Sequence, residues 1–242
     1  MNAAAGPRAN GLQPAGVDRT TATLLLAVPV LFPLWWYFAR PAALPGPGGE
    51  HDELWRVLAS FAAFALLLGV LPLLELLVRR EPPAADGHGR LAAHGLGFGD
   101  VRFGLRVVLF GLPLCALVAW SGASMPEVRA EYPLCKLLAT HTELRLPYWL
   151  AYAALYYVAW EWCFRGWMLF GLARRWPPAL AVLLQVVPSV LVHLGKPVGE
   201  TLGAVPFGLA LGWLALRTQS IWYGWLLHVL LGVLTDAMVL HG

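Results

Sequence analysis

Residues 59–78, ASFAAFALLLGVLPLLELLV, carry only one charged side chain, that of Glu75. A helix needs about 20 mostly apolar residues to cross the hydrocarbon core of a bilayer. Runs of comparable length recur along the chain, whereas the short alternating segments of a β-barrel are absent. The stretch therefore predicts an all-α fold, a polytopic transmembrane helical bundle.

The composition agrees with this prediction. Of the 242 residues, 59% are hydrophobic and 13% are charged, and the mean hydropathy is +0.63. The net charge is +3, but no basic stripe interleaved with aromatic residues occurs, so we expect a lipid bilayer and no nucleic acid as partner. The spacing of Cys115, Cys135 and Cys163 indicates neither a disulfide framework nor a thiolate metal site.

Hydropathy predicts about seven spans, at residues 21–39, 55–78, 104–122, 148–172, 179–194, 201–216 and 221–240. The fifth and sixth are short, and Gly195, Pro197 and Gly199 between them predict a break in the helix. Irregular backbone at membrane depth is stable only beside protein or water. We expect the break to lie in such a place.

The positive residues predict an orientation. With the N-terminus in the cytoplasm, ten of the 17 lysines and arginines lie on the cytoplasmic side and six lie opposite, while Arg165 lies inside a span. This distribution follows the tendency of cytoplasmic loops to be positive.

Ionisable residues inside the spans are candidates for function, because each is costly in hydrocarbon unless it is paired or hydrated. Glu75 is explained by an i,i+4 pair with Arg79. The other candidates within the spans or at the break are Glu161, Arg165, His193, Lys196, Glu200, His228 and Asp236.

Glu161 and Arg165 are also spaced i,i+4, so they share a helix face and can neutralise one another. A structural ion pair that fixes helix register is one interpretation. The other takes in His193, Glu200 and His228 on three later elements, since a carboxylate and imidazoles around a membrane cavity suit the activation of water for hydrolysis.

Residues 91–240 resemble the CAAX-prenyl-protease and bacteriocin-processing (CPBP) family of intramembrane proteases. The family's double glutamate, followed by an arginine in Phe-Arg-Gly, corresponds to Trp160, Glu161 and Arg165. A histidine at the end of a hydrophobic helix corresponds to His193, and a late histidine corresponds to His228. The resemblance implies peptide hydrolysis in the membrane, with a glutamate and the first histidine activating water and the last histidine stabilising the oxyanion.

The chain departs from the family pattern at three positions. Trp160 replaces the first glutamate, Ser189 replaces a phenylalanine, and Gly232 replaces an asparagine or aspartate that the family uses beside the last histidine. Asp236 is about 12 Å along the helix from His228, too far to replace that group.

These departures resemble a subgroup with a single-glutamate WExxFRG string and an HxGKPxxE string, here HLGKPVGE at residues 193–200. The resemblance suggests that Glu200 returns a second carboxylate to the site and shares acid and base duties with Glu161. Stabilisation of a helix N-terminus is the structural alternative for Glu200.

Two other kinds of catalytic site stay open. Residues 97–100, GFGD, match the GxGD signature of aspartyl intramembrane proteases, but Asp100 precedes a span, where we expect it to cap the helix. Zinc is the second alternative, although HExxH is absent. Its ligands would come from the set Glu161, His193, Glu200 and His228.

Two readings without proteolysis also stay open. With Trp160 in place of a glutamate, the chain could be a pseudoprotease that acts as a membrane scaffold or immunity factor. The cost of placing charged and polar site residues in a membrane favours a working enzyme. A transporter would share the broken helices, but the internal repeat expected of one is absent.

We therefore expect an intramembrane endopeptidase of the bacterial inner membrane that acts on a membrane-associated peptide or protein and needs no cofactor. Residues 1–20 are expected to form a disordered cytoplasmic tail, 21–90 the N-terminal transmembrane helices and 91–240 the catalytic core, the last two forming one domain. The expected roles are general base or its partner for Glu161, orientation for Arg165, water activation for His193, oxyanion stabilisation for His228 and a second carboxylate for Glu200.

Overall fold

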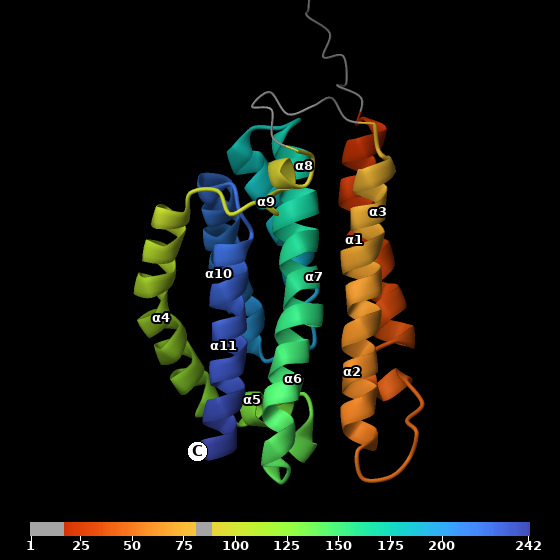
Figure 1. Ribbon diagram of the computed structural model, residues 1–242, viewed down its shortest axis with the longest axis vertical. Helices are drawn as coiled ribbons and strands as arrows, with labels where there is room; N and C mark the ends of the chain where they lie inside the picture. The colour runs from red at the N-terminus through yellow and green to blue at the C-terminus, as the bar shows by residue number, and fades with distance from the viewer. Residues whose placement is uncertain (1–16, 81–88) are drawn as a thin grey trace, which may run out of the picture.

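A computed structural model describes residues 17–80 and 89–242, and this part of the chain is helical without strands (Figure 1). Most of the predicted tail, residues 1–16, lies outside the described residues. Helix α1 begins at Arg19, two residues before the predicted span, because the Asp18 side chain accepts a hydrogen bond from the Thr21 amide at 2.6 Å and caps the helix.

Successive long elements run in opposite directions along the bundle (Figure 1). They are α1 (Arg19–Phe38), α2 (Asp52–Phe64) continued by η2 (Ala65–Val70) and α3 (Leu71–Val78), α4 (Val101–Ala123), α9 (Pro178–Leu191), α10 (Val198–Thr218) and α11 (Trp222–His241). An unbroken helical run over residues 145–173 comprises α6 (Arg145–Ala151), η6 (Tyr152–Tyr157), α7 (Val158–Glu161), η7 (Trp162–Met168) and α8 (Leu169–Ala173). The segments η2, η6 and η7 are π-helical.

Short elements connect the long ones at the ends of the bundle. They are α5 (Pro126–Glu131) and the 3-10 turns η1 (Pro41–Ala43), η3 (Ala92–His94), η4 (Lys136–Ala139) and η5 (Thr142–Leu144).

The prediction of a polytopic helical bundle is confirmed, and all seven predicted segments are helical. Five helical stretches among the described residues are long and apolar enough to cross a membrane: Arg19–Phe38, Asp52–Val78, Val101–Ala123, Val198–Thr218 and Trp222–His241. The sixth predicted span was expected to be short, which is wrong. Helix α10 has 21 residues because it begins directly after Pro197, a residue that suits a helix start.

The predicted break between the fifth and sixth segments lies between α9 and α10. Gly195 has a φ of +94°, a left-handed conformation that glycine adopts without steric cost. The Thr201 hydroxyl in the first turn of α10 donates to the His193 carbonyl at 2.8 Å. The turn that carries His193 is thereby fixed to the start of α10.

The run over residues 145–173 occupies the centre of the bundle, between α1 to α3 on one side and α4, α10 and α11 on the other (Figure 1). Every residue of η7, Trp162–Met168, is buried. The largest apolar cluster surrounds this run, with Leu24, Phe64 and Trp167 among its members. The quoted hydrophobic span at residues 59–78 packs against it.

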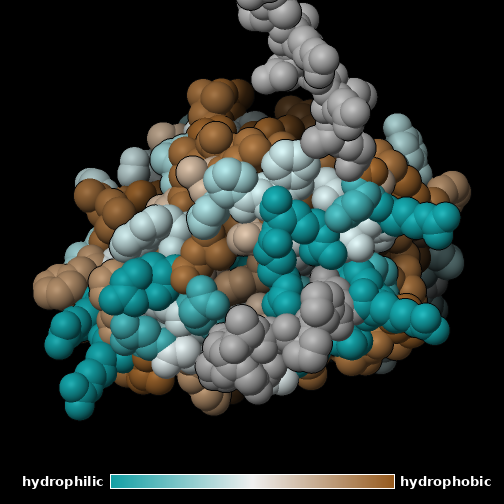
Figure 2. Space-filling model, turned by 90° about the horizontal axis from the view of Figure 1, so that it is seen from above, coloured by the Kyte–Doolittle hydropathy of each residue, from teal (hydrophilic) through white to brown (hydrophobic). Residues whose placement is uncertain are grey.

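The outside of the bundle is apolar along its length. Leu109, Phe110, Leu114 and Leu117 of α4 are each more than half exposed, which suits contact with lipid tails. Seen from the end that carries the start of α1, hydrophilic side chains gather across the surface and hydrophobic ones lie at its rim (Figure 2).

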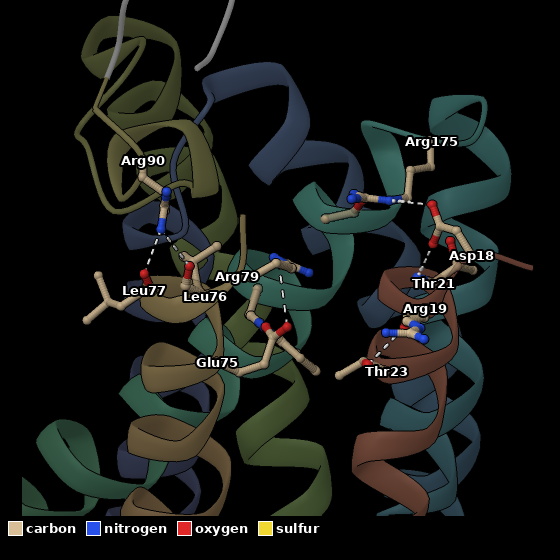
Figure 3. A network of polar contacts seen from close by, with 12 residues as sticks. Asp18, Arg19, Thr21, Thr23, Glu75, Leu76, Leu77, Arg79, Arg90 and Arg175 are labelled. Carbon is tan, nitrogen blue, oxygen red and sulfur yellow. Dashed lines mark hydrogen bonds and ion pairs between the residues drawn. The ribbon is translucent and has the colours of Figure 1, made fainter. Parts of the chain in front are cut away.

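Polar contacts at this end join the helix termini (Figure 3). Arg175 Nε lies 3.1 Å from Asp18 Oδ2, and Arg90 donates to the carbonyls of Leu76 and Leu77 at 3.0 and 2.8 Å, which satisfies the end of α3.

Two sequence predictions about charged residues at this end are confirmed. Arg79 Nε lies 3.7 Å from Glu75 Oε1. Asp100 caps α4 by accepting from the Phe103 amide at 3.1 Å, and it also pairs with Arg217 at 3.0 Å. The carboxylates of Glu75 and Asp100 therefore both have structural partners.

Glycine controls how closely α4 approaches α11. A Cβ at Gly104 would come within 2.4 Å of the Tyr223 ring, whereas one at Gly203 on α10 would meet nothing within 4 Å. We predict that Gly104→Ala lowers the free energy of unfolding by about 1–3 kcal/mol through overpacking, measured by denaturation in detergent micelles. Gly203→Ala is the control, and equal effects of the two substitutions would contradict the prediction.

Candidate active site

Glu161 and Arg165 form an ion pair in the interior of the bundle. Arg165 Nη1 lies 3.3 Å from Glu161 Oε1, and the two side chains are 2% and 0% exposed. The predicted i,i+4 pair is therefore confirmed. Burial at this depth requires each charge to have a partner, and a single arginine leaves part of the carboxylate available to another group.

His228 of α11 is the second partner of Glu161. Its Nδ1 lies 2.7 Å from Glu161 Oε1, and a carboxylate at this distance accepts a hydrogen bond from Nδ1–H. The imidazole is thereby oriented with Nε2 free for other contacts. A carboxylate in this position holds a histidine ring in one orientation and one tautomer.

His193 lies in the turn after α9, and its Nδ1 is 2.8 Å from the Ser189 carbonyl oxygen. Because a carbonyl only accepts, Nδ1 carries the proton and the neutral ring keeps a lone pair on Nε2. The Trp160 ring contacts both histidines, with its centroid 5.0 Å from that of His193 and 5.9 Å from that of His228. An aromatic ring therefore packs against both imidazoles at the position where the resemblance predicts a glutamate.

Glu200 lies in the first turn of α10, where a carboxylate also suits the helix dipole. The Tyr132 hydroxyl donates to Glu200 Oε1 at 2.7 Å. Burial and the Glu200 carboxylate raise the pKa of Tyr132 well above its ordinary value, so this hydroxyl stays protonated. Lys196 completes the chain, with Nζ 3.3 Å from the Tyr132 hydroxyl and paired with Glu131.

A small cavity brings three of the predicted site residues together. It has a volume of about 30 Å³, enough for about one or two water molecules. Its lining includes His193, Glu200 and His228. The other residues on its wall are Tyr132, Tyr152, Tyr156, Tyr157, Trp160, Val192 and Lys196.

Glu161 and Arg165 are absent from the cavity wall. Glu161 touches the site through His228, and Arg165 lies beyond Glu161. Of the two carboxylates assigned to the site, Glu200 is the one that faces the cavity.

An open hollow of about 490 Å³ lies beside the cavity, bounded by α5 and the start of α10. Lys196 therefore borders both the cavity and the open hollow.

Three of the four cavity tyrosines were not considered as site residues from the sequence: Tyr132, Tyr152 and Tyr156. Tyr152 and Tyr156 are spaced i,i+4 in a predicted span, and such a spacing is as typical of a packed core as of a site. Tyr132 lies in a connection whose folding back onto α10 no local pattern indicates.

Asp236 lies apart from the cavity and is fully buried. Its Oδ2 accepts a hydrogen bond from Trp149 Nε1 at 3.2 Å. This hydrogen bond joins α11 to α6.

Within residues 17–80 and 89–242, no group of three or more histidine, cysteine, aspartate or glutamate side chains is arranged to hold a metal ion. The four residues considered as zinc ligands are divided between the cavity wall and the position behind it. Glu161 Oε1 already contacts Arg165 and His228, and the nearby guanidinium opposes a further cation.

Residues 142–234 match the family model described as Rce1-like, type II CAAX prenyl endopeptidase. The matched range contains all five predicted site residues, and it supports the resemblance to CPBP proteases and protease activity as the class of function. No curated protein and no solved structure matches the chain.

The buried ion pair predicts a stability effect that does not depend on activity. Arg165→Met leaves the Glu161 charge without its arginine, and we expect a loss of about 3–5 kcal/mol in the free energy of unfolding. Adding Glu161→Gln removes that charge and should recover most of the lost free energy of unfolding. Detergent-based unfolding of both variants tests this, and a double variant less stable than Arg165→Met would contradict it.

Proposed function

We propose that the chain is an intramembrane endopeptidase of the glutamate and histidine type, which hydrolyses a peptide bond with an activated water molecule. The observation that carries this proposal is a water-sized cavity in an apolar bundle, lined by two imidazoles and a carboxylate. Such polar groups are costly at this depth, and hydrolysis needs both a base and a stabiliser for the oxyanion.

Glu200 and His193 are the groups suited to activate water. Both lie on the cavity wall, and the contact of His193 with the Ser189 carbonyl leaves a lone pair on Nε2. One of them takes a proton from water as its oxygen bonds to the substrate carbonyl carbon. The Tyr132 hydroxyl keeps the Glu200 carboxylate in place.

His228 is suited to stabilise the oxyanion. When the water oxygen bonds to the substrate carbonyl carbon, the π electron pair of the C=O bond moves onto the carbonyl oxygen. The negative charge on that oxygen is stabilised by an Nε2–H donor. Because Nδ1–H donates to Glu161, Nε2 is the ring nitrogen left for the substrate, and it donates when the imidazole is protonated. This arrangement makes Glu161 the partner of a catalytic histidine, with Arg165 orienting the carboxylate, and assigns the base duty to Glu200 and His193. Collapse of the intermediate breaks the C–N bond, and the amine leaves with a proton from the base.

The substrate class is a membrane-associated peptide or protein. A peptide can reach the cavity from the open hollow beside α5 once Lys196 moves. With the N-terminus in the cytoplasm of a bacterial inner membrane, the hollow lies toward the opposite side, because α5 and the start of α1 are at different ends of the bundle (Figure 1).

We predict that His193→Ala, Glu200→Gln, His228→Ala and Glu161→Gln each lower kcat by at least about 100-fold. The assay uses the purified protein in detergent with a library of hydrophobic peptides, read by mass spectrometry. Asp100→Asn is the control and should keep activity, since Asp100 caps α4; its inactivity would favour the aspartyl mechanism. Full activity of Glu200→Gln beside an inactive Glu161→Gln would end the assignment of the base to Glu200.

The proposed site works without a metal ion. Incubation with EDTA or 1,10-phenanthroline, followed by desalting, is expected to leave the cleavage rate unchanged, because no three potential ligands among the described residues converge on one point and Glu161 Oε1 already contacts Arg165 and His228. Loss of activity that zinc restores would instead support a zinc-dependent variant.

A further inference from the structure

Two glycines flank His228 on α11, one turn before it and one turn after it. A Cβ at Gly224 would lie 3.3 Å from Glu161 Oε2, and a Cβ at Gly232 would lie 2.0 Å from the Tyr157 hydroxyl oxygen. Glycine weakens a helix relative to alanine, so its presence at both positions is explained by the side chains that approach there. Each glycine makes room for a polar group from the central run.

The Tyr157 hydroxyl thus occupies the space that a side chain at residue 232 would fill. Tyr157 is 5% exposed and lines the same cavity as His228. The ring centroids of the two residues are 4.7 Å apart. The phenol therefore reaches the part of the wall where His228 lies.

The position of Tyr157 follows from the helical run that carries it. Tyr157 ends the π-helical segment η6, and Glu161 follows one turn later at the end of α7. Residues spaced i,i+4 share a helix face, so both side chains point toward α11. Glu161 contacts Nδ1 of the His228 ring. The Tyr157 hydroxyl packs against Gly232, one turn after His228.

We propose that Tyr157 is a further catalytic residue, whose hydroxyl donates the second hydrogen bond to the oxyanion beside His228. This inference rests on the proposed peptide hydrolysis. The Tyr157 hydroxyl donates a hydrogen bond and keeps its proton. The hydrogen bond stabilises the oxyanion of the tetrahedral intermediate, which forms when the water oxygen bonds to the carbonyl carbon. The contact weakens when the C–N bond breaks and the carbonyl group is restored. A fixed donor in a cavity with little water is effective for this purpose.

The first test is Tyr157→Phe, which removes the hydroxyl and keeps the ring. With the library peptide that the wild type cleaves fastest, kcat is expected to fall about 100-fold or more, while KM changes by less than about threefold because the donor acts on the transition state. Tyr148→Phe is the matched control. Tyr148 lies on the same helical run and is 1% exposed, but it does not line the cavity, so its loss of a hydroxyl should leave kcat unchanged.

The second test uses the glycine. Gly232→Ala displaces the Tyr157 hydroxyl and should lower kcat about as much as Tyr157→Phe, whereas adding Gly232→Ala to Tyr157→Phe should lower it by less than a further factor of about three. Gly203→Ala, on an open helix face, controls for a general effect of alanine. Unfolding in detergent verifies that each variant is folded.

The outcomes separate this inference from the proposed function. If Tyr157→Phe keeps kcat within about threefold while His228→Ala is inactive, hydrolysis stands and the role of Tyr157 is overturned. If Gly232→Ala lowers kcat by the same factor in the wild type and in Tyr157→Phe, the role of Tyr157 is also overturned. The effect of the glycine would then come from helix packing and not from the Tyr157 hydroxyl. Absence of cleavage by the wild type removes the proposed function and this inference together.

Discussion

A carboxylate inside a bilayer is unstable without compensating charge or hydrogen bonds, and the arrangement of the site follows from how Glu161 meets this constraint. Arg165 neutralises it from the same helical run, and His228 approaches it from α11. The contact with His228 joins two elements that are far apart in the sequence. It orients the His228 ring on the cavity wall. The histidine that stabilises the buried Glu161 charge is therefore also the one that can contact a substrate.

The polar side chains of the site follow one another from the interior of the bundle toward its surface. Glu161 lies behind His228, the cavity lies in front of it, and Glu200 lies on the wall with Tyr132 as its donor. Lys196 borders both this cavity and the open hollow. Charge is therefore compensated at each depth, which allows a hydrated space to exist in a bundle whose outer surface suits lipid.

Much of the fold was predictable from the sequence because hydropathy and helical spacing are local. The i,i+4 relation gave the Glu161–Arg165 pair, and the glycine and proline of residues 193–200 gave the break. The contact of Glu161 with His228 was not predictable in detail, since nothing local sets how α11 rotates. Whether Glu161 acts as the general base or as a partner stays a prediction, and the full burial of its side chain is the reason that we propose a partner's role.

The missing side chain at residue 232 shows why a departure from a motif needs a structure. The sequence shows Gly232 where the resemblance predicts an asparagine or aspartate, and by itself this suggests a lost function. In the fold, the same space holds the Tyr157 hydroxyl. A tyrosine among other aromatic residues in a predicted span gives no sign of this, because the relation depends on how two helices pack.

The proposed chemistry requires that buried imidazoles and a carboxylate meet around water inside the membrane bundle. An experimental structure at a resolution that shows ordered water tests it most directly. We expect density for at least one water molecule within hydrogen-bonding distance of His193, Glu200 or His228, with His228 Nδ1 hydrogen-bonded to Glu161. A dry cavity closed by apolar side chains, with the imidazoles turned away from each other and from Glu161, would contradict it.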